Sequence, residues 1–252
     1  MVDSALVRRH TDRMERGTPR QRARTRTTAD IIRIGREHLA THGAAALSLR
    51  AVARDLGVVS SAVYRYVQSR DELLTLLIVD AYNELGDEVD RALDEARERT
   101  AADRFLVVAH TVRRWALAEP ARYGLIYGGP VPGYAAPGEQ TTEPGTRVII
   151  ALLHIVNDMV GTGGATRVSS RLPRALRGDF KRIRESTHVA LPDEVLAVAV
   201  LAWTALFGAV SFEVFGQFGA DTFTDPASIF DVQMRQISAM LADSHRPRVS
   251  VR

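Results

Sequence analysis

The chain has 252 residues, of which 46% are hydrophobic and 25% are charged. This composition predicts a globular protein with a sizeable core. The sequence contains no cysteine, which excludes disulfides, thiol catalysis and cysteine-based metal sites and fits a reducing cytoplasm. The net charge of +3 is unevenly spread, because residues 1–26 hold eight arginines against three acidic residues and the remainder carries a net charge of −2.

An arginine-rich arm of residues 1–24 opens the chain, and we expect it to be disordered. Its first residues, MVDSALVRRHTDRM, contain no apolar run long enough for a signal peptide. Such an arm can pair with DNA phosphates or enter a minor groove, or it can remain a solvated tail without a defined contact. The residues alone leave these alternatives open.

The first predicted helix begins at a cap on Thr27 or Thr28 and runs to about His42, where Gly43 ends it. Its apolar spacing predicts one inner face that packs on the elements that follow. The residues expected on that face are Ile31, Ile34, His38 and Leu39.

A helix-turn-helix pattern occupies residues 48–67. Ser48 is a candidate N-cap of the first motif helix, and Gly57 ends that helix because glycine adopts the left-handed conformation at little cost. Ser60 is expected to cap the second motif helix. The residues of that helix expected to face inward are Val63 and Val67. The side chains left on or near its outer face, which a major groove can admit, are Ser61, Ala62, Tyr64, Arg65 and Tyr66.

Beyond the motif, Ser69 and Glu72 form a capping box that begins a long helix over residues 71–99. Glycine and proline predict a loop over 128–145, and 161–179 is expected to be a loop or a broken helix. The spacing of apolar residues predicts further helices at about 102–119, 121–127, 147–160, 192–218 and 226–242. The sequence shows no alternating β pattern, so the predicted fold class is all-α with about nine helices.

Three stretches in order, TADIIRIGREHLATHG, LSLRAVARDLGV and SSAVYRYVQSRDELL, resemble the DNA-binding domain of the tetracycline-repressor-like (TetR) family. Residues 113–134, RRWALAEPARYGLIYGGPVPGY, and 202–218, AWTALFGAVSFEVFGQF, resemble the WHG type of C-terminal regulatory domain to a lesser degree. The resemblance implies a three-helix DNA-binding domain at 25–75 and a helical ligand-binding and dimerisation domain at 76–244. We expect residues 245–252 to be a disordered tail.

The resemblance also implies which side chains meet DNA. The first motif helix would contact the phosphate backbone, the start of the second would approach base edges, and its tyrosines would hold phosphates. Arginine can fork onto guanine, and serine and tyrosine hydroxyls can bind bases or phosphates, so the chemistry agrees. The predicted DNA-binding residues are Thr27, Ser48, Arg50, Ser60, Ser61, Ala62, Tyr64, Arg65, Tyr66 and Arg70. The alternatives are packing for the tyrosines and a solvated charge for Arg70.

Residues 27–75 are nearly neutral, with six arginines against five acidic residues. We therefore expect the arm to supply most of the electrostatic attraction to DNA and the motif to supply fit and register. With small residues at the start of the second motif helix, direct base readout is expected to be sparse and DNA shape to contribute.

A pocket for a small, largely apolar effector is the second site that the resemblance implies. The candidate effector-binding residues are Trp115, Tyr123, Tyr127, His154, Asp158, Trp203 and Phe207. For the aromatic residues, ordinary core packing is the alternative. His154 and Asp158 have the spacing of two metal ligands on one helix face, but without a visible third ligand we predict no metal site, and we expect no cofactor.

Residues 195–212 form an uncharged run of borderline length for a membrane span. Polar residues within the run and acidic residues at both ends favour a helix buried on two sides in a soluble protein. Its neighbours would be the domain core and a second copy of the chain. We therefore expect a homodimer through helices 192–218 and 226–242, arranged as an intersubunit four-helix bundle.

Together these features predict a ligand-responsive transcriptional regulator, most simply a repressor, that binds a palindromic DNA operator as a cytoplasmic homodimer. A non-regulatory, architectural DNA-binding protein is the alternative within the same class. An enzyme is not expected, because the sequence has no Gly-rich phosphate loop after a strand, no Gly-x-Ser-x-Gly motif and no dense His/Asp/Glu cluster.

Overall fold

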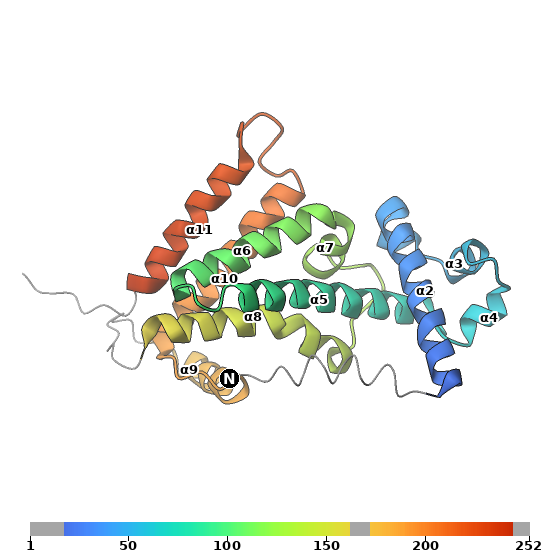
Figure 1. Ribbon diagram of the computed structural model, residues 1–252, viewed down its shortest axis with the longest axis horizontal. Coiled ribbons are helices and arrows are strands. Elements are labelled where there is room, and N and C mark those ends of the chain that lie inside the picture. The colour runs from blue at the N-terminus through green and yellow to red at the C-terminus, as the bar shows by residue number, and fades with distance from the viewer. Residues whose placement is uncertain (1–17, 162–171, 244–252) are drawn as a thin grey trace, which may run out of the picture. The chain divides into compact units, whose positions relative to one another are not determined.

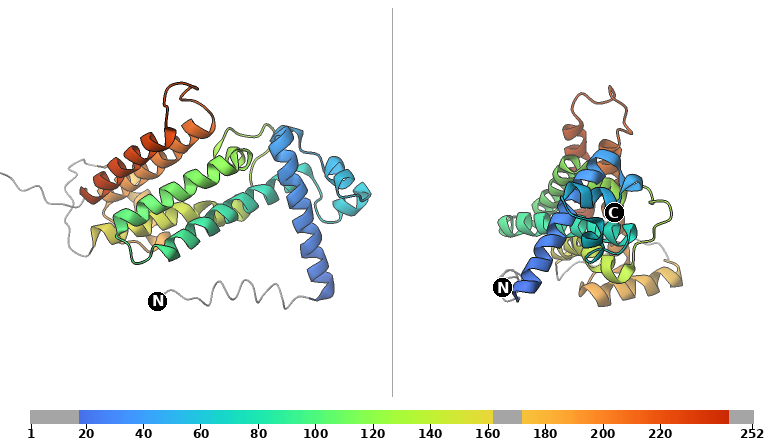
Figure 2. Two further views of the ribbon diagram at one scale, coloured as in Figure 1. Left: turned by 45° about the horizontal axis from the view of Figure 1, so that its top comes forward. Right: turned by 90° about the vertical axis from the view of Figure 1, so that its right-hand side faces the viewer.

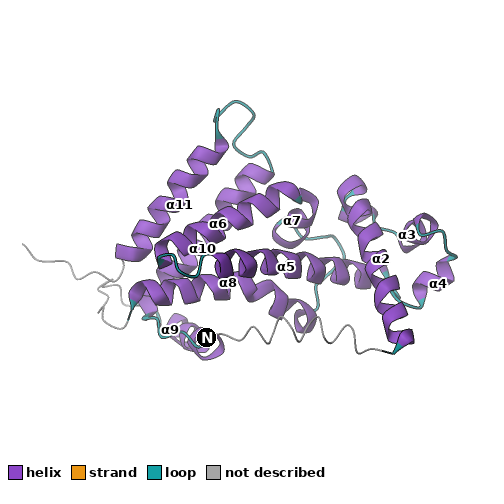
Figure 3. Ribbon diagram, in the orientation of Figure 1, coloured by secondary structure: helices purple, strands orange, loops and turns teal. Residues whose placement is uncertain are grey.

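The computed structural model describes residues 18–161 and 172–243, and the part of the chain that it describes is helical throughout, without a strand (Figures 1 and 3). The predicted all-α class is confirmed, with ten α-helices and one short 3-10 helix in these ranges. The chain divides into an N-terminal unit, which comprises the residues up to 80 and also 130–137, and a C-terminal unit, which comprises 81–129 and the residues from 138 onward.

The N-terminal unit contains helix α2 (Pro19–His42), the 3-10 helix η1 (Ala44–Ala46), α3 (Leu49–Asp55), α4 (Ser60–Tyr64) and the first part of α5 (Arg70–Glu95). All four residues predicted for the inner face of the first helix are buried. The core that they form with the following helices also contains Leu49, Val52, Val63, Val67, Leu73 and Leu77. Burial of this apolar surface holds α2, α3 and α4 against the first part of α5.

Helix α2 begins at Pro19, well before the predicted cap on Thr27 or Thr28. Thr18 is its N-cap, Pro19 occupies the first turn, and Gln21 completes a capping box with Thr18. The prediction that Thr27 or Thr28 caps this helix is therefore wrong, because both lie inside it and the Thr27 hydroxyl donates to the Ala23 carbonyl at 3.0 Å. The last residues of the predicted disordered arm are helical, while residues 1–17 lie outside the described part of the chain.

The turn of the helix-turn-helix is as predicted. Gly57 has φ +69, and the N–H groups of Gly57 and Val58 donate to the carbonyls of Arg54 and Ala53, which is the Schellman arrangement that ends a helix. Ser48 occupies the N-cap of α3 without a side-chain capping bond. Ser60 does not cap α4 as predicted, because it is the first helical residue and Val59 precedes it as the cap.

The C-terminal unit contains the rest of α5 and six further helices, with α10 and α11 side by side (Figures 1 and 2). Their bounds are α6 (Ala101–Ala118), α7 (Pro120–Tyr127), α8 (Gly138–Val160), α9 (Arg174–Thr187), α10 (Asp193–Val214) and α11 (Pro226–Asp243). One hydrophobic core joins these helices, and its most deeply buried side chains include Leu85, Phe105, Val112, Tyr123, Leu196 and Leu206. Helix α11 begins as predicted, with the Asp225 carboxylate accepting from the N–H groups of Ala227 and Ser228.

Two predicted loops are in part helical. Helix α8 begins at Gly138 and contains Pro144, so the prediction of a loop up to residue 145 is wrong. The Thr146 hydroxyl donates to the carbonyls of Thr142 and Glu143 beside this proline, which helps the helix to continue past it. Helix α9 begins at Arg174 inside the predicted loop or broken helix. Long helix α5 ends at Glu95, four residues before its predicted end.

Helix α10 is long and apolar enough to cross a membrane by length and composition alone, and 39% of its most apolar window is buried. In the C-terminal unit it packs against α6, α7, α8, α9 and α11. These contacts are those that the sequence predicts for a helix buried in the core of its domain. Two large apolar side chains of this helix, Leu201 and Phe212, are nevertheless exposed over 52% and 47% of their surface.

Candidate functional site

The outer face of α4 carries the residues predicted to approach DNA bases. Val63 and Val67 anchor this segment in the core, with 2% and 0% of their surface exposed. As a result Ser61, Tyr64 and Arg65 are exposed, while the other predicted residues of this segment, Ser60, Ala62 and Tyr66, are half-buried. From α3, Arg50 is exposed and Ser48 is half-buried. The structure therefore leaves several polar and basic side chains on these two short helices accessible to a partner.

Arg24 joins this set, although the sequence analysis did not single it out. Its guanidinium lies over the Tyr66 ring, with the carbon Cζ 5.9 Å from the ring centroid, within the range of a cation–π contact. The arginine lies seven residues before buried Ile31, so helical spacing from the core stripe indicates its direction once the helix is known to extend that far.

Arg70 has contacts within the N-terminal unit, and its role at DNA stays a prediction. Its guanidinium donates to the Ala44 carbonyl at 3.0 Å and lies 3.6 Å from the Asp71 carboxylate. The side chain thus ties the start of η1 to the start of α5 and is engaged within the N-terminal unit. Thr27 is half-buried and its hydroxyl donates to its own helix, and its role at DNA likewise stays a prediction.

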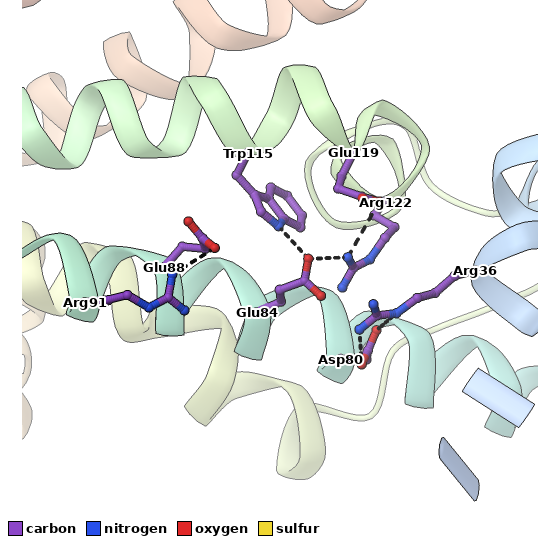
Figure 4. A network of polar contacts seen from close by, with 8 residues as sticks. All are labelled: Arg36, Asp80, Glu84, Glu88, Arg91, Trp115, Glu119 and Arg122. Carbon is purple, nitrogen blue, oxygen red and sulfur yellow. Dashed lines mark hydrogen bonds and ion pairs between the residues drawn. The ribbon is translucent and has the colours of Figure 1, made fainter. Parts of the chain in front are cut away.

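Two charged contacts fix the framework beneath the exposed face. The Arg36 guanidinium binds the Asp80 carboxylate through two hydrogen bonds of 2.6 and 2.7 Å, joining α2 to α5 (Figure 4). Buried His38 contacts Asp55 at 2.6 Å, joining α2 to α3. The hydrogen bonds from His38 and then from Arg54 hold the pKa of the Asp55 carboxyl below its usual range. A rigid framework of this kind keeps exposed side chains in one arrangement for binding.

Four of the predicted effector residues lie together in the C-terminal unit. Tyr127 packs on Phe207 with ring centroids 4.3 Å apart, and Tyr123 and Trp203 flank this pair at 5.3 and 6.1 Å. The Tyr123 hydroxyl contacts the Phe207 carbonyl and the Ser211 hydroxyl. Burial raises the pKa of Tyr123 to about 12, and burial likewise raises the pKa of Tyr127.

Two members of this aromatic cluster were missed by the sequence analysis. Tyr82 of α5 packs on Tyr127, and Phe215 at the end of α10 packs on Tyr123, both with ring centroids 5.9 Å apart. Tyr82 lies on a different helix from the predicted members, so spacing within one helix could not have found it, whereas Phe215 directly follows α10, eight residues after Phe207. Desolvation raises the pKa of the Tyr82 hydroxyl as well.

The other three predicted effector residues lie apart from this cluster or serve another purpose. The Trp115 indole donates to Glu84 at 3.2 Å, and Glu84 also binds buried Arg122 at 2.6 Å (Figure 4). His154 and Asp158 are exposed on α8, and Asp158 pairs with Arg104 at 2.9 Å. The assignment of His154 and Asp158 to an apolar pocket is therefore wrong, and that of Trp115 stays a prediction. Within the described ranges, no group of three or more metal-ligating side chains is present.

A surface groove of about 490 Å³ lies between α10 and α11. It is largely apolar, and its lining includes Gly208, Phe212, Phe218, Ile237 and Met240. None of the seven predicted effector residues lines it. The groove instead follows the two helices that the sequence analysis assigned to dimerisation.

Comparison with known proteins adds two family matches. Residues 31–77 match the model described as "Bacterial regulatory proteins, tetR family", and residues 105–237 match "Tetracyclin repressor-like, C-terminal domain". The WHG type of that domain stays a prediction. Two similar proteins are the HTH-type transcriptional regulators Rv1816 of Mycobacterium tuberculosis (strain ATCC 25618 / H37Rv) and Mb1846 of Mycobacterium bovis (strain ATCC BAA-935 / AF2122/97). Each is 47% identical over 89% of this chain and 96% of its own length.

Solved structures agree with these matches. The regulatory protein SCO4313 is 34% identical, with a TM-score of 0.70 over 87% of this chain and 98% of that one. A protein of unknown function from Rhodococcus sp. RHA1 has a TM-score of 0.59 at 22% identity over 86% of this chain and 95% of that one, which shows the shared fold.

Proposed function

Because the chain belongs to the TetR family of DNA-binding transcriptional regulators, we propose that it is a ligand-responsive repressor that binds a palindromic operator as a homodimer. A small, largely apolar effector would release it, and the cytoplasm is its place of action. The observation that carries the proposal is the exposed face of α4, where Arg65 is accessible on a helix that Val63 and Val67 anchor. In a dimer, two such helices would enter successive major grooves, roughly 34–36 Å apart.

Arg65 is the side chain best suited to read a base. It is exposed at the C-cap of α4, and within the described part of the chain it has no ion-pair partner. A bidentate contact with guanine contributes about 1–3 kcal/mol of discrimination. Arg65→Ala should therefore weaken specific operator binding about tenfold or more in a gel-shift titration and leave dimerisation intact.

Arg33→Ala is the matched control for this variant. Arg33 is also an exposed arginine of the N-terminal unit, but it pairs with Glu37 on its own helix at 2.9 Å. Footprinting of the DNA that flanks the protein's own gene would supply the operator. Equal affinities of Arg65→Ala and wild type would refute the role of Arg65, and a footprint without sequence preference would instead indicate an architectural DNA-binding protein.

A second copy of the chain is the proposed occupant of the groove between α10 and α11. Large apolar side chains stay exposed on these helices, including Leu201 and Phe212 on α10 and Val232 and Met240 on α11. A two-fold axis would pair each α10 and α11 with their copies and bury these side chains in a four-helix bundle. Exposed apolar surface of this kind on a helix pair fits an obligate interface.

Sedimentation analysis can test this interface. Leu201→Arg and Val232→Arg should each convert the dimer to a monomer, because each places a charge in the buried centre of the bundle. Leu117→Arg changes an apolar residue of α6 that is 41% exposed and should leave the dimer unchanged. A dimer that survives both bundle variants would contradict the assignment of this face.

The aromatic cluster around Phe207 is the proposed effector region. It is apolar and carries few hydrogen-bonding groups, as small-molecule sites do. Helix α5 contributes Tyr82 to the cluster and continues into the N-terminal unit, so effector binding can act on the DNA-binding helices through one continuous helix. Trp115 and Trp203 are the two tryptophans of the chain, so Trp115→Phe leaves Trp203 as a fluorescent reporter.

That reporter gives the effector proposal its test. Apolar compounds that release the operator in a binding screen should also change the fluorescence of Trp203 in the Trp115→Phe variant. The further substitution Phe207→Ala should weaken both responses to the same compound. Operator release without any change at Trp203 would place the effector elsewhere.

A further inference from the structure

We propose that the helical extension at the start of α2, residues 19–26, carries a second DNA-contacting element in which Arg20 and Arg24 bind operator phosphates beside the α4 helix. The proposal rests on the proposed function, because it takes the α4 face as the DNA-binding face. The extension lies before the part of the chain that matches the family's DNA-binding model, which begins at residue 31. It therefore lies outside the matched region.

The extension is a helix for local reasons. The Thr18 hydroxyl accepts from the Gln21 N–H, and the Gln21 side chain accepts from the Thr18 N–H at 2.8 Å. Pro19 begins the helix without losing an N–H bond. The residues from 18 to 26 are all exposed, so burial in the N-terminal unit does not explain why this segment is ordered as a helix. The first turns of α2 project past α3 and α4 of the same unit (Figures 1 and 2).

Four arginines of the extension fall on two opposite stripes of the helix. Arg24 lies seven residues before buried Ile31 and thus continues the face of α2 that packs on the unit. Arg20 lies one turn earlier, within about 40° of Arg24, whereas Arg22 and Arg26 lie about 160° away on the opposite side. The inner stripe, Arg20 and Arg24, therefore continues toward α4, and the outer stripe, Arg22 and Arg26, does not.

The Arg24–Tyr66 contact links the inner stripe to the candidate DNA-binding face. Tyr66 comes just after Arg65, the C-cap of α4, and the Arg24 guanidinium lies over its ring. Stacking on a ring uses the face of the guanidinium and leaves its N–H groups at the edge free to fork onto a phosphate. Within the described ranges, neither Arg24 nor Arg20 has an acidic partner. Phosphates along the DNA backbone offer the opposite charge next to a helix held in a groove.

Two double variants of the full chain provide a matched test. Arg20→Ala with Arg24→Ala removes the inner stripe, and Arg22→Ala with Arg26→Ala removes the same charge from the outer stripe. Both change exposed residues of one helix, so circular dichroism should show equal helix content. The measurement is affinity for the footprinted operator duplex as a function of salt, by fluorescence anisotropy.

The inner-stripe variant should lower the slope of log affinity against log salt by about 3–4, because a dimer loses four phosphate contacts at about 0.9 each. Its affinity loss between about 50 and 200 mM salt should then be roughly 100-fold smaller than that of wild type. The outer-stripe variant should keep the wild-type slope. Equal slopes for the two variants, or an unchanged slope for the inner-stripe variant, would overturn the proposal.

Arg65→Ala separates this inference from the proposed function. If Arg65→Ala weakens specific binding while the inner-stripe variant keeps the wild-type salt slope, the inference fails and the proposed function stands. If Arg65→Ala leaves specific binding unchanged, the proposed role of the α4 face fails, and with it the reason for placing the inner stripe beside DNA.

Discussion

Removing the Glu84 carboxylate tests how the C-terminal unit holds α5. Glu84 lies on α5, and its oxygen Oε1 accepts from Arg122 of α7 at 2.6 Å and from the Trp115 indole of α6 at 3.2 Å (Figure 4). The Arg122 guanidinium also lies over the Trp115 ring, 5.4 Å from its centroid. One carboxylate therefore joins three helices, so Glu84→Leu should be among the most destabilising single substitutions on α5.

The structure sets the size of this effect. Only 3% of the Arg122 side chain is exposed, so Glu84→Leu leaves a buried cation without its main counter-charge. Breaking a buried ion pair on one side costs about 3–5 kcal/mol. The low end applies here, because 34% of the Glu84 side chain is exposed and Glu119 stays 3.6 Å from Arg122 as a second acid. We expect a loss of about 3 kcal/mol in the free energy of unfolding.

Urea unfolding followed by circular dichroism measures this loss, and a double-mutant cycle identifies its cause. Adding Arg122→Met to Glu84→Leu removes the buried cation and fills the site with apolar groups, so the double variant should be within about 1 kcal/mol of wild type. A loss below about 0.5 kcal/mol for Glu84→Leu alone would show that the pair acts like a surface ion pair. Additive losses in the double variant would refute the reasoning from charge burial.

Two further predictions concern single side chains. Tyr123→Phe removes the hydroxyl contacts to Phe207 and Ser211 and should cost about 1–2 kcal/mol near neutral pH. Burial raises the pKa of Tyr123 from 10.0 to about 12, so the stabilising contribution of its hydroxyl is complete below pH 10 and is lost as the pH rises toward 12. The difference in unfolding free energy between Tyr123→Phe and wild type should therefore narrow above about pH 10. A difference that stays constant with pH in urea titrations would contradict this. Gly57→Ala should lower the unfolding free energy by about 1 kcal/mol through backbone strain alone, because φ is +69 and the new Cβ meets nothing within 4 Å. Gly57→Asn should cost less, and an equal cost for both in thermal unfolding would indicate a steric cause.

The helix-turn-helix could be predicted because its determinants are local. The left-handed glycine, the two inward valines and the short turn are adjacent in sequence, and each has one physical meaning there. The apolar helices α10 and α11 were equally accessible to prediction, because a long uncharged run and an Asp-Pro cap specify a buried helix and a helix start. In these segments the local pattern and the tertiary surroundings agree.

Apolar periodicity could not predict helical turns whose side chains are exposed. The first turns of α2 and of α8 are largely exposed, so neither shows a hydrophobic stripe, and both predicted starts lie about nine residues too far along the chain. A capping pattern was present at Thr18, Pro19 and Gln21, and it alone could have shown the true start of α2. For α8, the glycines and Pro144 favoured a loop, although one proline can be accommodated where a nearby hydroxyl bonds the adjacent carbonyls.

The candidate effector site could not be predicted fully for a different reason. Helical spacing says that His154 and Asp158 share a face of α8, but it does not say which face, and the structure places both on the exposed side. Tyr82 and Phe215 join the cluster from helices far apart in the sequence, and only tertiary packing brings them to Tyr123 and Tyr127. A site made from three helices, α5, α7 and α10, cannot be read from the pattern of any one of them.

The net charge of the segment 27–75 also did not show which of its arginines are paired with acidic residues. Residues 27–75 contain six arginines and five acidic residues, which suggests an almost neutral surface. Four of the arginines are engaged within the unit, where the partners of Arg33, Arg36, Arg54 and Arg70 are Glu37, Asp80, Asp55 and the Ala44 carbonyl, respectively. The two without an ion-pair partner among the described residues, Arg50 and Arg65, are both exposed, and both lie on the short helices predicted to meet DNA. Because paired charges cancel locally, the positive potential of this segment is concentrated on that face, and the motif itself can attract the phosphates that it is proposed to bind.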